Sequence, residues 1–231
     1  MLDPKSRVVM LSGASRGIGA AVCDRLLASG FLVSAGVRNP SALADRAGLF
    51  ATRYDATVQG AAEDWVETTM TRFGRVEALV NVAGMLPNYT LHDADETQLD
   101  RALEINVKAP LRLIRAAMPH LKACGDGRIV NVSSLSGKRV ANDDVGYAMS
   151  KFAVTALTHA ARRDGWDSGV RATVVCPGFV ATDMTSHVRT VPPEKMTQPE
   201  DLAVLIETVL LLPQTAVVAE LLVNCRLETV I

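Results

Sequence analysis

The stretch "LSGASRGIGA", residues 11–20, places Gly13, Gly17 and Gly19 between an apolar run, Val8–Leu11, and a helical pattern. A strand that turns sharply into a helix needs backbone freedom at the turn. Gly13 suits the unusual dihedral angles, Gly17 leaves room for a ligand, and Gly19 lets the helix sit close to the strand. The amides at the helix start can then hold a phosphate. The spacing GxxxGxG is only moderately specific, so a glycine-rich turn without a ligand is the alternative interpretation.

The rest of the chain repeats this alternation of apolar runs and helical patterns. Most of the runs are continuously apolar, as in strands of a parallel sheet that helices cover on both faces. The pattern predicts an α/β, Rossmann-type doubly wound sheet in a single domain over residues 1–231. The expected strands are Val8–Leu11, Phe31–Val37, Leu49–Tyr54, Ala78–Val82, Arg128–Val132, Ala172–Val175 and Val217–Val223. The expected helices are Gly17–Ser29, Thr57–Phe73, Glu96–Cys124, Gly146–Gly165 and Pro199–Leu212.

Composition narrows the function classes. The chain has 231 residues, of which 48% are hydrophobic and 21% charged, with a net charge of −1. A near-neutral chain without a nucleic-acid motif does not indicate a nucleic-acid partner, and no apolar stretch is long enough to cross a membrane. The four cysteines and four histidines are scattered, so we expect reduced thiols, no metal site and a cytoplasmic location.

The end of the second expected strand bears on the cofactor. An NAD site often carries an acid about 20 residues after the glycines, bonded to the ribose hydroxyls. Here Val37 and Arg38 occupy that region. Arg38 suits a 2′-phosphate, and Arg16 in the glycine turn can add a second positive charge. These residues favour NADP(H) over NAD(H), although NAD(H) stays possible, and Arg38 at a strand end can also be merely solvated.

A second pattern, "YAMSK", places Tyr147 and Lys151 on one face of a helix, four residues apart. A free tyrosine has a pKa near 10, too high for proton transfer at neutral pH. A lysine cation about 6 Å away is worth about 3 kcal/mol at an effective dielectric constant near 20, which would lower that pKa by roughly two units. Ser133 and Ser134, at the end of the preceding strand, offer a hydroxyl that can hold a carbonyl oxygen. Together these residues predict a proton donor, Tyr147, whose pKa is lowered by Lys151.

Together these motifs resemble the short-chain dehydrogenase/reductase family along nearly the whole chain. The matching stretches are "SGASRGIG", "YDAT", "NVAG", "IN" with Asn106, "VSS", "YAMSK" and "CPGFVATDM". The resemblance implies a seven-stranded parallel sheet and hydride transfer between a nicotinamide and a carbonyl or alcohol carbon. Ser12 stands where the family usually has threonine, and Val82 replaces the second asparagine of "NNAG".

The resemblance also implies a role for each catalytic residue. Tyr147 would be the general acid or base, and Lys151 would bind the nicotinamide ribose and lower the tyrosine pKa. Ser134 has the family's spacing from the tyrosine and would orient the substrate oxygen. Asn106 would hold a water that links Lys151 to solvent. Pro110 supports this last role, because it has no N–H to bond the carbonyl of residue 106.

The implied cofactor site extends over most of the motifs. Asp55 would bond the adenine, Asn81 to Gly84 would line the adenosine ribose, and Pro177 to Thr182 would enclose the nicotinamide. The full set of expected cofactor-binding residues is Gly13, Ser15, Arg16, Gly17, Ile18, Gly19, Arg38, Asp55, Ala56, Asn81, Ala83, Gly84, Tyr147, Lys151, Pro177, Gly178, Val180 and Thr182.

The sequence thus predicts an NADPH-dependent reductase of a small ketone or aldehyde, with a short substrate lid near residues 183–199. The alternatives are an NAD-dependent alcohol dehydrogenase and a non-catalytic nucleotide-binding protein on the same fold. We further expect a homodimer or homotetramer. The segment "FAVTALTHAA" after Lys151 is small and apolar on nearly every side, and Leu111, Ile114 and Met118 extend around more than one face of their helix.

Overall fold

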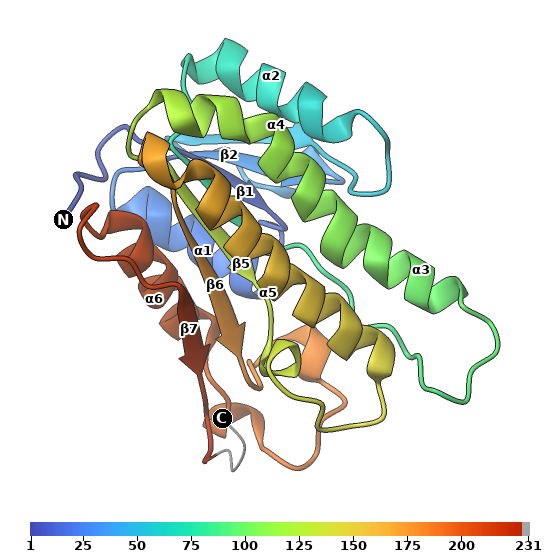
Figure 1. The fold of residues 1–231 in the computed structure, drawn as a ribbon. Helices are drawn as coiled ribbons and strands as arrows, with labels where there is room; N and C mark the ends of the chain where they lie inside the picture. The colour runs from blue at the N-terminus through green and yellow to red at the C-terminus, as the bar shows by residue number, and fades with distance from the viewer. Residues whose placement is uncertain (228–231) are drawn as a thin grey trace.

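A parallel sheet of seven strands forms the centre of the computed structural model, which describes residues 1–227 (Figure 1). Neighbouring strands follow the order β3-β2-β1-β4-β5-β6-β7, and every pair is parallel. This arrangement confirms the predicted Rossmann-type doubly wound fold. The strands are β1 (Val8–Ser12), β2 (Leu32–Val37), β3 (Leu49–Arg53), β4 (Ala78–Asn81), β5 (Arg128–Val132), β6 (Arg171–Pro177) and β7 (Glu220–Val223).

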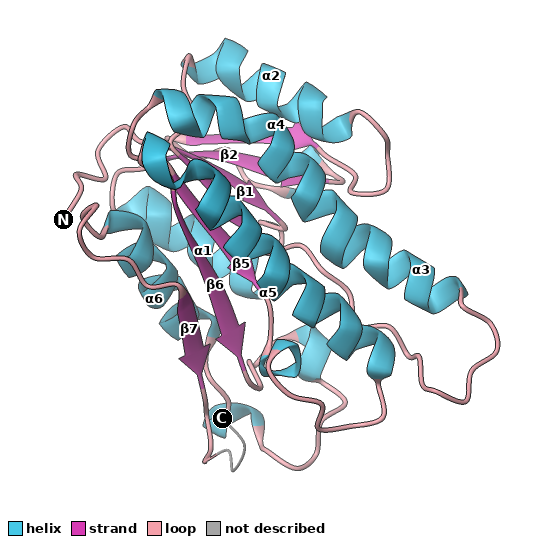
Figure 2. Ribbon diagram, viewed as in Figure 1, coloured by secondary structure: helices cyan, strands magenta, loops and turns pink. Residues whose placement is uncertain are grey.

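Helices cover the sheet on both faces (Figure 2). On one face α1 packs against α6, and on the other α2, α4 and α5 lie side by side. Each face therefore encloses its own apolar core, which explains why β1 and β4 are buried along their whole length. The helices are α1 (Gly17–Ala28), α2 (Ala61–Phe73), α3 (Thr97–Leu103), α4 (Ala109–Ala123), α5 (Val145–Gly165) and α6 (Pro199–Leu211).

Two expected elements begin several residues later than predicted, and most of the others differ by one or two residues at an end. The helix predicted from Thr57 begins at Ala61, because Asp55 caps a turn by accepting from the Thr57 amide at 3.0 Å and Gly60 then takes a positive φ of 82°. The strand predicted from Val217 begins at Glu220.

The helix predicted over Glu96–Cys124 is interrupted by a single wide turn. Between α3 and α4, residues Glu104–Lys108 form a π-helical turn in which the Ala109 amide bonds the Glu104 carbonyl. Pro110 follows directly, and it has no amide with which to continue the α-helical pattern. Ile114 and Met118 of α4 are buried in their own chain beside Trp65 and Val66, so they do not form the exposed second apolar face that the sequence suggested.

The topology leaves a crevice at the carboxyl end of β1. The chain crosses from β1 to β2 on one side and later returns to β4 on the other, so the connections after these strands diverge. Ligands of open α/β sheets bind at such a point. No helix in the described part of the chain is long and apolar enough to cross a membrane.

An indole ring lies directly behind this crevice. Trp65 of α2 is fully buried, and its Nε1 donates to Ser34 of β2 at 3.0 Å. A Cβ on Gly36 would come within 2.5 Å of the indole, so the absence of a side chain at this position leaves room for the ring. The ring centroid of Trp65 lies 4.9 Å from that of Tyr54, which follows β3.

Candidate active site

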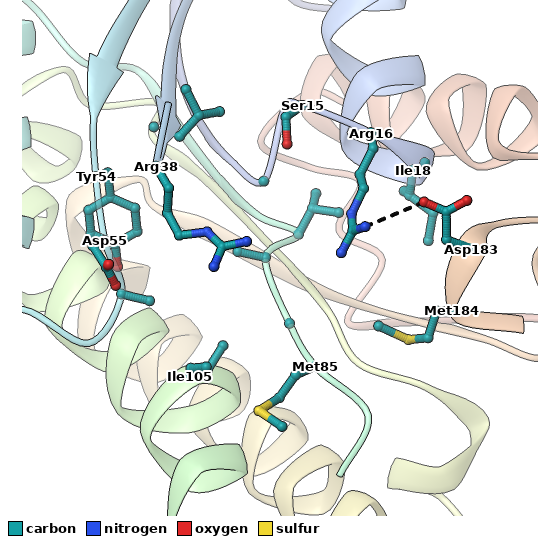
Figure 3. Close-up of a pocket in the computed structure, with 18 of the residues that line it drawn as sticks. Ser15, Arg16, Ile18, Arg38, Tyr54, Asp55, Met85, Ile105, Asp183 and Met184 are labelled. Atoms are coloured by element: carbon teal, nitrogen blue, oxygen red, sulfur yellow. Dashed lines mark hydrogen bonds and ion pairs between the residues drawn. The ribbon is translucent and has the colours of Figure 1, made fainter. Parts of the chain in front are cut away.

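A pocket of about 740 Å³ opens at the carboxyl ends of β1, β2, β3 and β4 (Figure 3). Its volume lies within the range of roughly 300–1,000 Å³ that small-molecule sites occupy. The walls come from the glycine turn, the ends of β2, β3 and β4, the π turn and the start of the 183–199 segment. The lining residues are Gly13, Ser15, Arg16, Gly17, Ile18, Gly36, Val37, Arg38, Tyr54, Asp55, Ala56, Thr57, Val82, Ala83, Gly84, Met85, Leu86, Arg101, Ile105, Thr182, Asp183 and Met184.

The three glycines of the opening turn each meet a steric requirement. Gly13 has a φ of +77°, and a Cβ there would lie 2.8 Å from the Ala83 nitrogen. Gly17 has a φ of +53° and would place a Cβ 3.1 Å from the Thr182 side chain. A Cβ on Gly19 would lie 2.0 Å from the Gly13 carbonyl oxygen, so this glycine lets α1 approach the turn. The turn thus leaves the amino end of α1 open toward the pocket.

The departure at Ser12 is accommodated in the same region. The Ser12 hydroxyl oxygen accepts from the amides of Val82 and Ala83 at 3.2 and 3.3 Å. These bonds tie the end of β1 to the loop after β4. A serine therefore makes these bonds without the methyl group of a threonine.

Charged side chains surround the pocket where β2 and β3 end. Arg38 extends into it from the end of β2, and Asp55 stands nearby after β3 (Figure 3). Hydrogen bonds from the Thr57 amide and hydroxyl lower the pKa of Asp55, with Arg38 adding a smaller electrostatic effect. Asp55 is therefore a carboxylate at neutral pH, able to accept hydrogen bonds. On the far side Arg16 pairs with Asp183 at 3.4 Å.

The second cluster of polar residues lies where β5 ends and α5 begins. The Ser134 hydroxyl is close enough to Tyr147 to act on its pKa, and it lies 3.5 Å from the Pro177 carbonyl. Asp144 caps α5 by accepting from the Tyr147 amide at 3.0 Å. The cap fixes the first turn of the helix and so places the tyrosine toward Ser134.

Lys151 lies one helical turn beyond the tyrosine. Its Nζ donates to the Val132 carbonyl at 3.0 Å and sits 5.5 Å from the centroid of the Tyr147 ring. A Cβ on Gly84, which lines the pocket, would lie 3.7 Å from this nitrogen. The Ser134, Tyr147 and Lys151 cluster therefore adjoins the pocket at Gly84.

Burial is the largest influence on the pKa of both Tyr147 and Lys151. It raises the pKa of Tyr147 to about 12, although the Ser134 hydrogen bond acts in the opposite direction. It also lowers the pKa of Lys151 to about 8. Both shifts come mainly from the removal of these groups from water, and the lowering of the tyrosine pKa by Lys151 stays a prediction. Near pH 7 the tyrosine is protonated and the lysine is mostly charged.

Asn106 lies in the π turn between the pocket and α5. Its amide nitrogen donates to the Met85 carbonyl at 2.9 Å and to the Ser150 hydroxyl at 3.0 Å, while its oxygen accepts from the Met85 amide at 2.8 Å. A Cβ on Gly84 would lie 3.3 Å from that oxygen. The side chain thus uses both N–H donors and one of the two acceptor sites of its oxygen within the protein, and Pro110 cannot bond the backbone carbonyl of this residue.

The structure separates the roles of the two adjacent serines. Ser133 points inward and donates to the Lys151 carbonyl at 2.8 Å. Ser134 instead faces Tyr147. The choice of Ser134 over Ser133, which rested on family spacing, stays a prediction.

Not every expected cofactor residue reaches the pocket wall. Asn81 is buried and donates to the Asn131 side chain at 2.8 Å, because β4 is covered on both faces and directs this side chain into the sheet core. The other expected residues that do not line the pocket are Gly19, Pro177, Gly178, Val180 and the catalytic set. Sequence reasoning missed Arg101, Ile105, Asp183 and Met184, which line it. Arg101 and Ile105 are four residues apart on one helical face, a spacing that could have revealed them.

A family model described as short chain dehydrogenase matches residues 7–192. The chain belongs to the short-chain dehydrogenase family. The expected resemblance to this family is thereby confirmed.

The curated relatives of the chain include proteins named as reductases. It is 39% identical over 98% of its length to an agropine synthesis reductase of Rhizobium rhizogenes. That match covers 54% of the relative, so the chain spans about half the length of the first relatives it matches. It is also 30% identical over 81% of its length to an acetoacetyl-CoA reductase of Rhizobium meliloti, of which 78% is covered.

A solved structure shares the fold. The crystal structure of a 3-ketoacyl-(acyl-carrier-protein) reductase from Brucella melitensis, complexed with NADH, has a TM-score of 0.87 at 21% identity, covering 96% of this chain and 98% of that one.

Proposed function

We propose that the protein reduces a ketone or aldehyde to an alcohol with NADPH as the preferred hydride donor. The observation that carries the proposal is the Ser134, Tyr147 and Lys151 cluster, which adjoins a dinucleotide-sized pocket at Gly84. A protein that only binds a nucleotide has no need of a hydroxyl pair at this place.

The residues present fit a dinucleotide. The glycine turn opens toward the pocket at the amino end of α1, whose unpaired amides favour an anionic phosphate. At the end of β2 an arginine replaces the acid that would bond a free ribose hydroxyl, and Arg38 would hold a 2′-phosphate. Asp55, Ala56 and the Ala83–Gly84 loop would hold the adenosine part, and Thr182 would hold the carboxamide.

When bound, the reduced nicotinamide would supply the hydride that reaches the carbonyl carbon. Ser134 would donate a hydrogen bond to the carbonyl oxygen and fix its position. Tyr147 would transfer its phenolic proton to the same oxygen as negative charge develops there. Lys151 would hold the ribose hydroxyls and stabilise the phenolate left behind. The backbone carbonyl of Asn106, which Pro110 cannot bond, would bind the water through which a proton returns.

Two observations favour reduction over oxidation. Tyr147 carries its proton near neutral pH, which is the state from which a general acid acts, although its pKa of about 12 makes it a weak donor until that value is lowered. The agropine synthesis relatives, like the acetoacetyl-CoA relative, are named reductases.

The proposal is tested by following nicotinamide absorbance with NADPH and NADH against a panel of ketones and aldehydes. We expect NADPH oxidation with at least one carbonyl compound. Tight cofactor binding without turnover on any member would favour the non-catalytic alternative, and faster turnover of alcohols with NAD would favour the dehydrogenase.

We also propose that the protein is a homo-oligomer. On α5, Met149 and Phe152 are 48% and 43% exposed, one helical turn apart, and a second copy would cover them. Light scattering at micromolar concentration should return at least a dimer mass. Phe152→Glu should lower that mass, while Leu91→Glu in an exposed loop should leave it unchanged. A monomer mass for the unmodified protein would contradict the proposal.

A further inference from the structure

Asp183 has a fixed position at the edge of the nucleotide pocket. It is the first residue of the short helical turn Asp183–Thr185, which begins directly after Thr182. The Thr182 amide donates to the Thr185 hydroxyl at 3.2 Å, and that hydroxyl also donates to the Thr182 carbonyl at 3.0 Å. Just before this turn, the Ala181 amide bonds the Thr197 carbonyl at 3.0 Å. The backbone that carries Asp183 is thus anchored on both sides and is not a loose loop.

This carboxylate engages Arg16 from the opposite end of the chain. The Arg16 guanidinium lies 3.4 Å from the Asp183 carboxylate, although the two residues are 167 positions apart. Arg16 stands at the amino cap of α1 and makes no capping bond with its side chain. In the view of Figure 3 it lies between Arg38 and Asp183. One of the two arginines that favour a 2′-phosphate is therefore paired with an acid.

We infer that Asp183 is a specificity-determining residue that limits the preference for NADPH by holding Arg16. A 2′-phosphate bound by Arg38 must compete with Asp183 for the second arginine. Removal of the carboxylate frees Arg16 for the phosphate, whereas NADH lacks the group that would benefit. The inference rests on the proposed function, since it concerns which dinucleotide that same pocket selects.

The size of the effect follows from the exposure of the pair. Arg16 and Asp183 keep 75% and 80% of their side chains accessible to solvent. Exposed ion pairs contribute little, so freeing Arg16 should change affinity by about 1.5- to fivefold. A direct repulsion between Asp183 and the cofactor phosphates is the competing explanation. It would act on both dinucleotides through their common pyrophosphate, and it would not require Arg16.

The experiment is a double-mutant cycle on the dissociation constants of NADPH and NADH, measured at low ionic strength, where exposed charges act most strongly. The proteins are the unmodified chain, Asp183→Asn, Arg16→Ala and the double variant. We expect Asp183→Asn to tighten NADPH by about 1.5- to fivefold and leave NADH unchanged. In the Arg16→Ala background the same change should have no effect. Glu194→Gln, an exposed acid in the next turn of the 183–199 segment, is the matched control and should change neither affinity.

Three results would overturn the inference: no tightening of NADPH, equal tightening of both dinucleotides, or tightening that persists without Arg16. Arg38→Ala, measured in parallel, reports on the proposed function separately. If Arg38→Ala weakens NADPH selectively while Asp183→Asn does nothing, only the role of Asp183 fails. If Arg38→Ala weakens both dinucleotides equally, the proposed NADPH preference fails, whatever Asp183 does.

Discussion

At the edge of the pocket beside the glycine turn, Arg16 and Asp183 keep three-quarters or more of their side chains in solvent, whereas Lys151, in the cluster that adjoins the pocket at Gly84, is only 6% exposed. The two ends are also built from different parts. The first relies on glycine backbone and on long charged side chains from strand ends. The second relies on short hydrogen bonds between β5 and α5, such as those of Ser133 and Lys151.

This difference determines what each end can control. In a buried cluster each ionisation depends on desolvation, so one atom can change the chemistry by orders of magnitude. On an exposed rim, water and salt weaken every charge, so selectivity is modest and depends on conditions. Catalysis should therefore be sensitive to single atoms and insensitive to salt, and cofactor preference the reverse.

The largest effect should come from Tyr147→Phe. Loss of the phenolic hydroxyl removes the proton donor but keeps the ring, so kcat should fall by about 10²- to 10⁴-fold while NADPH affinity changes little. Steady-state kinetics on an identified carbonyl substrate, with a separate cofactor titration, measures both. Tyr89→Phe removes the same atom from a loop residue and serves as the control. Retention of more than about a tenth of the activity would be inconsistent with general acid catalysis by this residue.

Arg38→Ala should produce the next largest effect, confined to NADPH. A charge-assisted hydrogen bond is worth about 1.5–3 kcal/mol, so NADPH affinity should fall by roughly ten- to a hundredfold while NADH affinity is almost unchanged. Titration of each cofactor into the variant measures this. Arg53→Ala, at the exposed end of the neighbouring strand, controls for a general loss of positive charge. Equal affinities for the two cofactors in the unmodified protein would also contradict the assignment.

The pH profile should show the buried lysine. In the proposed mechanism Lys151 acts in its charged form, which exists below its pKa of about 8 and is lost as the pH rises through that value. Between about pH 7 and pH 9 the charged fraction falls from roughly 90% to 10%, so kcat should fall about tenfold. Lys151→Arg keeps the positive charge throughout this pH range. Any residual kcat of that variant should therefore not fall between about pH 7 and pH 9. An equal fall of kcat at alkaline pH in both proteins would exclude the deprotonation of Lys151 as its cause.

The smallest effect should come from salt, and it should separate the two ends. Raising the ionic strength from about 0.1 M to about 1 M shortens the Debye length from about 10 Å to about 3 Å. The NADPH preference should then shrink severalfold, whereas the factor lost in Tyr147→Phe should stay constant. Parallel titrations and rate measurements at several salt concentrations test this. A salt-independent preference would mean that the 2′-phosphate is bound in a more enclosed place than Arg38 provides.

The sequence predicts the fold and the glycine turn well because both depend on local patterns. Continuously apolar runs mark strands covered on two faces, and the positions of Gly13, Gly17 and Gly19 follow from the sharp turn between β1 and α1. The Tyr147 and Lys151 spacing is likewise local, since one turn of a helix brings the two side chains to one face.

The remaining properties depend on contacts that no local pattern contains. The pairing of Arg16 with Asp183 joins residues 167 positions apart, and the sequence around neither residue predicts it. The inward direction of Asn81 depends on Asn131 in the neighbouring strand. The pKa of Tyr147 depends on how much protein surrounds it, which a lysine four residues away does not reveal.

The buried indole of Trp65, behind the crevice, gives the protein an intrinsic fluorescence signal close to the pocket. Trp65 lies one aromatic ring, that of Tyr54, from the pocket that would hold the adenosine, and it is sealed from water. Its emission should respond when the pocket is filled, and the reduced nicotinamide absorbs in the range where tryptophan emits. Trp166, the second tryptophan, is on the surface between Arg162 and Arg171 and should contribute a constant background. Cofactor affinities of every variant are thus measurable from intrinsic fluorescence, before any substrate has been found.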